Sequence, residues 1–162
     1  MDHINRVSSK IIKREYLQSL LTYWRLKDNK VVFTNGCFDL LHKGHIEYLS
    51  SAADNGDMLI VGLNSDDSVK RIKGEKRPIQ DESSRALTLA SLKMVKAVVL
   101  FEEDTPYNLI SEIKPDVLVK GADYKEEEIV GADIVKKNEG EIITVPLTEG
   151  YSTSNIIDKI SK

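Results

Sequence analysis

Two histidines, His42 and His45, stand three positions apart just after the apolar run 31–34, with Gly44 between them. If a helix begins near Gly44, both imidazole rings can face one anionic group beside the free N–H groups of the helix end, which already favours an anion. Imidazoles that donate hydrogen bonds there would stabilise a phosphorus centre as it gains negative charge. Phosphoryl and nucleotidyl transfer depend mainly on such positioning and need no nucleophile from the protein. The pattern therefore predicts phosphate-centred transfer.

Other interpretations of this segment have less support. A zinc site would need a third ligand, and none is evident nearby in the sequence. Histidines that merely lie on the surface would not need the apolar strand, the Asn35-Gly36 pair and the Phe38-Asp39 pair that precede them. Cys37 is expected to be a small residue in a tight loop, because the spacing puts no general base beside it.

A basic cluster follows the next apolar run, residues 57–63. The two polar residues after that run can cap a helix, on which Lys70 and Lys73 lie one turn apart and can share a face. With Gly74 at the helix end, the cluster predicts a flexible basic lip over the site. The alternative is a solvated basic surface with Gly74 as the helix C-cap.

Two further polar segments follow later apolar runs. In the first, Gly121 permits close approach of the backbone to a ligand, and Asp123 could accept hydrogen bonds from ribose hydroxyls. The alternative is a turn with an Asp cap. In the second, three hydroxyl residues at 152–154 open the last helix, which is an N-cap signal and equally a set of phosphate ligands.

The elements that must position these segments alternate between short apolar runs and amphipathic stretches, without repeats or linkers. Apolar strands separated by helices predict a parallel sheet covered on both faces, with right-handed crossovers. The expected strands are 30–34, 57–63, 96–101, 116–120 and 141–145. The expected helices are 10–27, 44–54, 81–93, 105–113 and 153–161. The fold class is therefore α/β, a Rossmann-like doubly wound five-stranded parallel sheet, whose ligands bind outside the carboxyl ends of the strands.

Composition excludes several classes of protein. A net charge of -3 without a basic arm argues against a nucleic-acid partner. No stretch approaches the roughly 20 apolar residues of a membrane helix, and no signal-peptide run begins the chain. The one cysteine cannot form an internal disulfide, so the expected location is cytoplasmic. The role of residues 1–9 is not set by the sequence, and disorder is the expectation for them.

The segment 35–45 resembles the His-x-Gly-His signature of the cytidylyltransferase-like nucleotidyltransferase superfamily. The resemblance is strongest to D-glycero-β-D-manno-heptose 1-phosphate adenylyltransferases, the adenylyltransferase domain of ADP-heptose synthases, and it covers nearly the whole chain. That family carries runs similar to 68–78 and 120–124, and the superfamily has an Ile-Ser-Thr-Thr-like motif at 152–154. Glycerol-3-phosphate cytidylyltransferases, which the chain also resembles, carry an Arg at the position of Leu147. A phosphate contact that they use is absent here or moved to a Lys elsewhere, which favours the heptose branch without choosing ATP over CTP.

The resemblance implies transfer of AMP from ATP to D-glycero-β-D-manno-heptose 1-phosphate, giving ADP-heptose and pyrophosphate for lipopolysaccharide core biosynthesis. Mg²⁺ is expected to bind mainly through the triphosphate, because the sequence has no dedicated carboxylate cage. The expected partners are ATP and a sugar 1-phosphate, with no nucleic acid and no membrane, and a homodimer is common among relatives. One nucleotidyltransferase domain is expected over 1–162, with an N-terminal extension at 1–28 containing one helix and a Rossmann-like core at 29–162. The chain has no room for the sugar kinase of the bifunctional relatives.

The expected site residues combine the motifs and the resemblance. The catalytic candidates are His42, His45, Lys70 and Lys73. The substrate-binding candidates are Asp39, Arg77 and Arg85, although Arg85 could simply pair with Asp81. The nucleotide-binding candidates are Thr34, Asn35, Gly36, Cys37, Phe38, Asp39, Gly44, Lys120, Gly121, Asp123, Ser152, Thr153 and Ser154. No residue is expected to ligate a metal.

Two other functions stay open at this point. The first is a cytidylyltransferase that acts on glycerol 3-phosphate or another small polyol phosphate. The second is a non-catalytic nucleotide-binding module, which would bind ATP in a calorimeter without forming product. The presence of both His42 and His45 speaks against the module, because binding alone does not need the pair.

Overall fold

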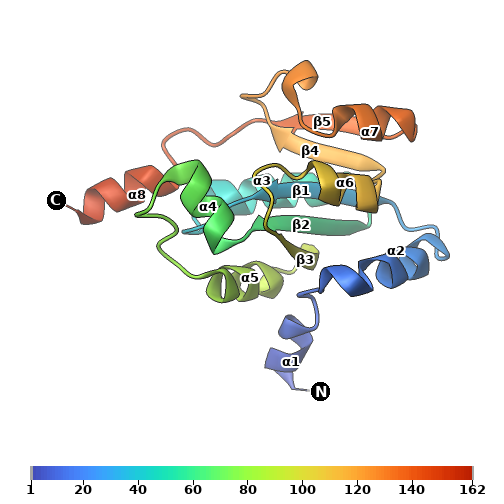
Figure 1. Ribbon diagram of the computed structural model, residues 1–162, viewed down its shortest axis with the longest axis horizontal. Coiled ribbons are helices and arrows are strands. Elements are labelled where there is room, and N and C mark those ends of the chain that lie inside the picture. Colours follow the sequence, from blue (N-terminus) through green and yellow to red (C-terminus); the bar gives the residue numbers. More distant parts are fainter. Residues whose placement is uncertain (1, 162) are drawn as a thin grey trace.

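Five strands form one all-parallel sheet in the computed structural model, which describes residues 2–161 (Figure 1). The strands are β1 (Val31–Gly36), β2 (Met58–Asn64), β3 (Val95–Phe101), β4 (Val117–Gly121) and β5 (Glu141–Val145). They lie in the order β3-β2-β1-β4-β5, so the strand order reverses at β1. The expected five-stranded parallel sheet is confirmed.

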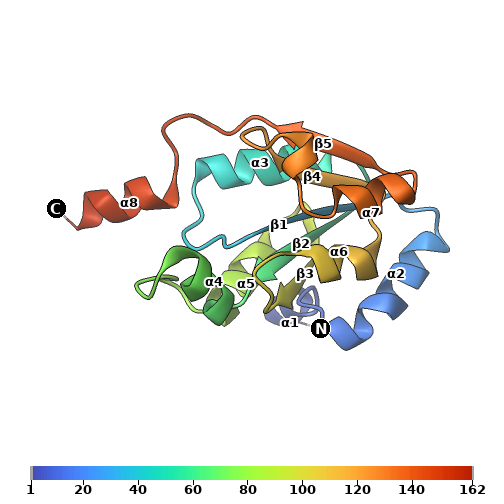
Figure 2. The same ribbon diagram turned by 45° about the horizontal axis from the view of Figure 1, so that its top comes forward.

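Helices cover both faces of the sheet (Figure 2). The α-helices are α1 (His3–Ser8), α2 (Leu17–Arg25), α3 (Lys43–Ala53), α4 (Asp66–Lys73), α5 (Glu82–Ser91), α6 (Tyr107–Ile113), α7 (Ala132–Lys137) and α8 (Thr153–Ile160). Two 3-10 turns are η1 (Arg14–Tyr16) and η2 (Glu126–Glu128). Because side chains of a strand alternate between faces, Phe33 of β1 packs on one side, against α2 and α6, and Val32 on the other, against α3 and α5. This double coverage explains why the strands are apolar along most of their length.

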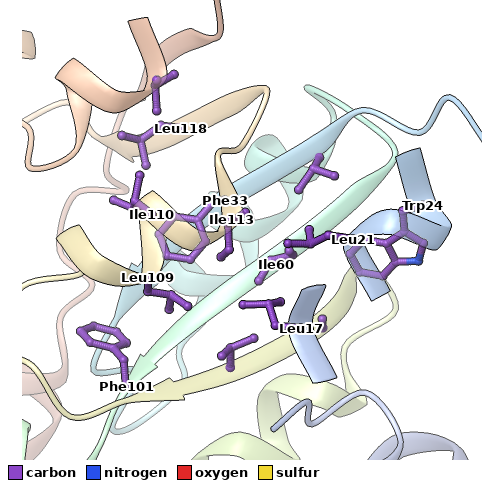
Figure 3. Packing of buried hydrophobic residues seen from close by; sticks show 14 of the residues in the cluster. Leu17, Leu21, Trp24, Phe33, Ile60, Phe101, Leu109, Ile110, Ile113 and Leu118 are labelled. Atoms are coloured by element: carbon purple, nitrogen blue, oxygen red, sulfur yellow. The ribbon is translucent and has the colours of Figure 1, made fainter. Parts of the chain in front are cut away.

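One hydrophobic core lies between the sheet and helices α2, α6 and α7. Figure 3 shows Leu17, Leu21 and Trp24 of α2 on the same side of the sheet as Leu109 and Ile110 of α6. Their spacing is that of one helical face, as the sequence pattern predicts. The sheet is thereby held rigid behind the edge that carries the polar segments.

The N-terminal region differs from its expected single helix at 10–27. Residues 10–12 are extended and pair with β3: the Ile12 N–H donates to the Val98 carbonyl at 2.9 Å, and the Val98 N–H donates to the Lys10 carbonyl at 2.8 Å. Only 17–25 is α-helical there. The sequence pattern could not show this, because the partner strand lies far away along the chain.

The expectation of disorder before residue 10 is wrong for the described part of that segment. Residues 3–8 form α1, and Asp2 caps the helix by accepting a hydrogen bond from the Asn5 N–H at 2.9 Å. Met1 lies outside the described residues.

The remaining elements lie close to their expected positions, with two additions, α7 and η2. Helix α4 is the one that the capping residues at 64–65 indicate, and Ser65 does cap it by accepting from the Ser68 N–H at 3.2 Å. Helix α7 and the turn η2 were not expected, because α7 is six residues long and its apolar residues are too few to show a period. In residues 2–161 no helix has the length and apolar character needed to cross a membrane.

Candidate active site

A pocket of about 590 Å³ opens where β1, β2 and β4 end. This is the edge at which ligands bind in doubly wound sheets, on both sides of the strand-order reversal. The expected site residues that line it are Asn35, Gly36, Cys37, Phe38, Asp39, His42, Gly44, His45, Lys73, Arg77, Lys120, Gly121, Asp123, Ser152, Thr153 and Ser154. Thr34, Lys70 and Arg85 do not line it.

The two histidines are stacked at the start of α3, with ring centroids 3.8 Å apart and an angle of 23° between the rings. His42 is the N-cap residue of this helix, and His45 lies in its first turn. Both rings line the pocket, while their Nδ1 atoms are buried against the protein. The stacked pair can therefore meet an anionic ligand through the part of each ring that faces the pocket.

Phe38 holds the pair from the side. Its ring meets that of His45 edge to face, with centroids 5.3 Å apart. The backbone of Phe38 is in the left-handed region, at φ 43°, which is uncommon for a bulky residue. The loop between β1 and α3 therefore holds a backbone conformation that costs free energy, in the place where it directs an aromatic ring onto His45.

Burial keeps both imidazoles neutral in the free protein. It lowers the pKa of His45 to about 4, to which the adjacent His42 also contributes, while the Leu40 carbonyl partly opposes the change. Burial also lowers the pKa of His42. At neutral pH the pair therefore offers N–H donors without a fixed positive charge.

A bound triphosphate should reverse this effect, because nearby negative charge favours the imidazolium form and raises the pKa. We expect net uptake of protons when ATP binds at pH 7.5, growing as the pH falls toward the raised pKa. Calorimetric titration of ATP in two buffers that differ in ionisation enthalpy measures the number of protons. At this pH the terminal phosphate of free ATP is already largely ionised. His45→Asn should reduce the uptake, and an unchanged value in that variant would contradict the expectation.

The start of α8 reaches the histidine loop. The Thr153 hydroxyl donates to the Leu40 carbonyl at 3.2 Å, and Ser152 caps α8 by accepting from the Asn155 N–H at 3.0 Å. Tyr151 lies beside His42, with ring centroids 6.3 Å apart. Three hydroxyl residues and the free N–H groups of a helix start thus share the pocket with the stacked pair, as phosphate binding requires.

Asp39 lines the pocket, but its carboxylate already accepts hydrogen bonds from other parts of the protein. Its carboxylate accepts from the Arg77 guanidinium at 2.7 Å and from the backbone N–H groups of Ile79 and Gln80. Burial alone would raise the pKa of this carboxyl, but those donors hold the pKa below its ordinary value. In this structure the residue anchors the basic loop that carries Arg77, and the expected substrate contact from Asp39 stays a prediction.

Arg85, an expected substrate contact, does not line the pocket. Its side chain is 0% exposed, and its guanidinium donates to the carbonyls of Gln80 and Cys37 and to the Asp66 carboxylate. It therefore ties the β1–α3 loop to α4 from behind and does not reach the pocket. The alternative pairing with Asp81 is also wrong, because the Asp81 carboxylate caps α5 through Ser84.

Three other expected site residues lie in different places: one lines the pocket, one lies beneath its floor and one lies outside it. Thr34 is fully buried, and its hydroxyl pairs with that of Tyr48 at 2.8 Å, so it supports the floor of the pocket. Lys70 lies outside the pocket, 3.5 Å from Asp67, whereas Lys73 lines it. Of the two lysines of α4, Lys73 is therefore the one that can meet a ligand.

Several residues that line the pocket were not expected from the sequence. They include Tyr48, Asn64 and Tyr151. The position of Tyr151, directly before the hydroxyl run, was a signal that could have been used. Tyr48 lies inside α3, and only the folded chain brings its hydroxyl to the Val119 carbonyl, 3.2 Å away.

The chain is similar to known proteins of one family. Residues 33–159 match the family model described as cytidylyltransferase-like. The chain is 51% identical to the bifunctional protein HldE of Wolinella succinogenes, over 98% of this chain and 32% of that protein. It is 58% identical to the bifunctional protein HldE of Campylobacter jejuni subsp. doylei, over 88% of this chain and 30% of that protein. The chain thus spans about a third of the length of the curated relatives that it matches.

Solved structures agree with these matches. The lipopolysaccharide core biosynthesis protein of Thermoplasma volcanium is 33% identical, with a TM-score of 0.61, over 76% of this chain and 99% of that one. The pantoate-beta-alanine ligase of Francisella tularensis has a TM-score of 0.57 over 89% of this chain and 69% of that one. At 19% identity the ligase shows a shared fold alone.

Proposed function

Because the chain belongs to the cytidylyltransferase-like family, we propose that it transfers AMP from ATP to a sugar 1-phosphate and releases pyrophosphate. The observation that carries the proposal is the stacked pair of His42 and His45, which lines the pocket at the start of α3. The pair shares one pocket with the hydroxyl residues that open α8. The family that the sequence motifs indicate is confirmed.

The proposed acceptor is D-glycero-β-D-manno-heptose 1-phosphate, and the product is ADP-heptose for lipopolysaccharide core biosynthesis. The identity of about half or more with proteins named bifunctional protein HldE supports this choice. The similarity to the lipopolysaccharide core biosynthesis protein of Thermoplasma volcanium supports it as well. The proposed place of action is the cytoplasm, where ATP is available. The homodimer expected from relatives stays a prediction, which light scattering can test.

In the proposed reaction an oxygen of the acceptor phosphate attacks the α-phosphorus of ATP in line with the bond to the β-phosphate. The new O–P bond forms as the bond between the α-phosphorus and the bridging oxygen breaks, and pyrophosphate leaves with that electron pair. His42 and His45 donate hydrogen bonds to the α-phosphate oxygens as their charge grows. Lys73, at the end of α4, balances charge on the departing phosphates. No residue of the protein forms a covalent bond to the substrate.

Within residues 2–161 no group of three or more His, Cys, Asp or Glu is arranged to hold a metal ion. Asp39, one of the carboxylates that line the pocket, already accepts hydrogen bonds from Arg77 and Gln80. We therefore propose that Mg²⁺ enters on the triphosphate, whose charge it reduces, as is usual for this hard ion.

A panel of two nucleotides against two acceptors tests the proposal. ATP and CTP are each combined with heptose 1-phosphate and glycerol 3-phosphate, and pyrophosphate release is measured. We expect the highest kcat/KM for ATP with heptose 1-phosphate. The apolar residue Leu147 lines the pocket where glycerol-type enzymes carry an Arg, which favours the heptose acceptor, and the choice of ATP follows from the resemblance to the heptose 1-phosphate adenylyltransferases. A preference for CTP with glycerol 3-phosphate would replace the proposal by its alternative. Binding of ATP without product from any acceptor would identify a non-catalytic module.

A further inference from the structure

Tyr151 is an aromatic residue of the pocket to which the proposed reaction gives no role. It lies directly before the hydroxyl run that opens α8, and it is 48% exposed. Its ring stacks on that of His42, with centroids 6.3 Å apart and an angle of 29° between the rings. A half-exposed ring in this place can set the orientation of the histidine beside it.

The orientation of the His42 ring depends on packing. Among residues 2–161 its side chain neither caps α3 nor has a hydrogen-bond partner for its Nδ1 atom. The rings that stack on it are those of His45, at 3.8 Å, and Tyr151. Because His45 and Phe38 belong to the same loop and first helical turn as His42, Tyr151 is the aromatic contact that comes from a distant part of the chain.

The segment that carries Tyr151 is fixed to α3 and its loop on both sides of the ring. Before the ring, the Thr148 hydroxyl donates to the Glu47 carboxylate at 2.5 Å. Over the ring, the Lys43 ammonium group lies 5.6 Å from the centroid, within the range of a cation–π contact. After the ring, the Thr153 hydroxyl donates to the histidine loop at 3.2 Å. The ring of Tyr151 is therefore held against the start of α3.

Gly44 leaves the space that this contact needs. A Cβ atom there would lie 3.1 Å from the Nδ1 atom of His42 and 3.3 Å from the Cβ atom of Tyr151, closer than such atoms usually pack. The residue between the two histidines thus allows the tyrosine to approach them.

Helix α8 has few other contacts that could fix its start. None of its residues, Thr153–Ile160, is buried, and Figures 1 and 2 show the helix extending away from the sheet. The arrangement of its hydroxyl residues relative to the histidines therefore depends on the contacts around Tyr151 and Thr153.

We propose that Tyr151 is a positioning residue, whose ring holds His42 in the orientation from which it donates to the α-phosphate. This inference rests on the proposed function. Aromatic pairs at such centroid distances are stabilising, and a hydrogen bond weakens when its donor turns away from the acceptor. The role belongs to the ring of Tyr151 and not to its hydroxyl.

Steady-state pyrophosphate release tests this role in four variants of the full chain. Tyr151→Ala and Tyr151→Leu remove the ring, Tyr151→Phe keeps it, and Tyr16→Ala is the matched control, a tyrosine that is 60% exposed and lies outside the pocket. We expect kcat to fall about 3–10-fold without the ring, the factor to which one aromatic pair corresponds. Tyr151→Phe and the control should stay within about twofold of the parent, and the KM for ATP should change little, as for an interaction that matters in the transition state.

A double-mutant cycle separates positioning of His42 from a structural effect. In the His42→Ala background, the change Tyr151→Ala should lower kcat by less than about twofold, because the group that the ring positions is already absent. Equal effects of Tyr151→Ala in the two backgrounds would overturn the inference.

The pKa of His42 is a second readout, which does not depend on turnover. Burial lowers this pKa in the parent, and removal of the ring admits water to the imidazole. The pKa of His42, measured by NMR, should therefore rise toward its ordinary value in Tyr151→Ala and stay low in Tyr151→Phe. The exposed His3 is the internal reference. An unchanged pKa of His42 in Tyr151→Ala would show that the ring does not cover it.

The remaining outcomes also decide the question. Equal losses of kcat in Tyr151→Phe and Tyr151→Ala would assign the role to the hydroxyl. Calorimetry with a non-hydrolysable ATP analogue should give a Kd within about threefold of the parent in Tyr151→Ala, because Thr153 still joins α8 to the histidine loop. A much weaker analogue with an unchanged kcat would assign the ring to nucleotide binding.

The proposed function and this inference fail in different ways. Parent protein that releases no pyrophosphate with any acceptor contradicts the proposed function. The NMR titration of His42 still tests the contact with Tyr151 in that case, because it needs neither ATP nor an acceptor.

Discussion

Replacing either His42 or His45 by Ala is expected to lower kcat by about 10²–10³, the usual cost of removing a preorganised donor to a developing oxyanion. The KM for ATP should change much less, because the lost hydrogen bond matters most when the α-phosphorus is crowded with charge. Steady-state pyrophosphate release with ATP and heptose 1-phosphate measures both quantities.

The chain supplies its own control for this experiment. His3, the third histidine, is the first residue of α1 and is exposed, so His3→Ala should leave kcat unchanged. The two active-site changes should also be less than additive when combined, because rings stacked at 3.8 Å act as one unit. Turnover within a few fold of the parent in either single variant would refute the role proposed for the pair.

Arg85→Met is expected to lower the free energy of unfolding by about 3 kcal/mol, the low end of the usual cost of removing one partner from a buried ion pair, because Asp66 is 29% exposed. The side chain of Arg85 is 0% exposed, and its loss leaves Asp66 without its 2.7 Å partner. The carbonyls of Cys37 and Gln80 lose their donors at the same time. Urea denaturation followed by circular dichroism measures the change.

Arg71→Met provides the comparison for Arg85. Arg71 also makes a 2.7 Å ion pair, with Asp104, but the two side chains are 50% and 61% exposed. Exposed pairs of this kind contribute about 0–1 kcal/mol. Equal losses in the two variants would show that the burial of Arg85 is not what makes its ion pair important.

Much of the fold was predictable because parallel strands covered on both faces must be apolar throughout. Residues 57–63 and 116–120 show this directly, and the strands form within about a residue of those ranges. The N-terminal pairing of Ile12 with Val98 could not be predicted, because it depends on an edge of the sheet that exists only after folding. The short α7 has too few apolar residues to show a period.

The site was predictable to the extent that each motif follows a strand. Parallel strands end at one edge, so His42, Lys120 and Ser152 had to approach one another if the sheet formed. The structure differs from the expected site at charged residues whose hydrogen bonds are made within the protein. Asp39 and Arg85 have the residue types of ligand contacts, but Asp39 pairs with Arg77, 38 positions away. Arg85 pairs with Asp66, 19 positions away, and with the Cys37 carbonyl, 48 positions away. Sequence spacing carries no information on such pairings, and only the folded loops show which charges are already matched.

The central place of β1 has a consequence for how the protein is made. One neighbour of this strand, β2, follows it closely in the sequence, but the contact between Asn35 and Lys120 spans 85 residues. At the usual rate of translation, on the order of 5–20 residues per second, the β4 side of the nascent β1 strand waits roughly 4–17 seconds for its partner. Through that interval the ribosome-bound chain presents an open strand edge beside the histidine loop, and the nucleotide pocket has only part of its walls. The pocket is therefore completed only when the last strands of the sheet dock.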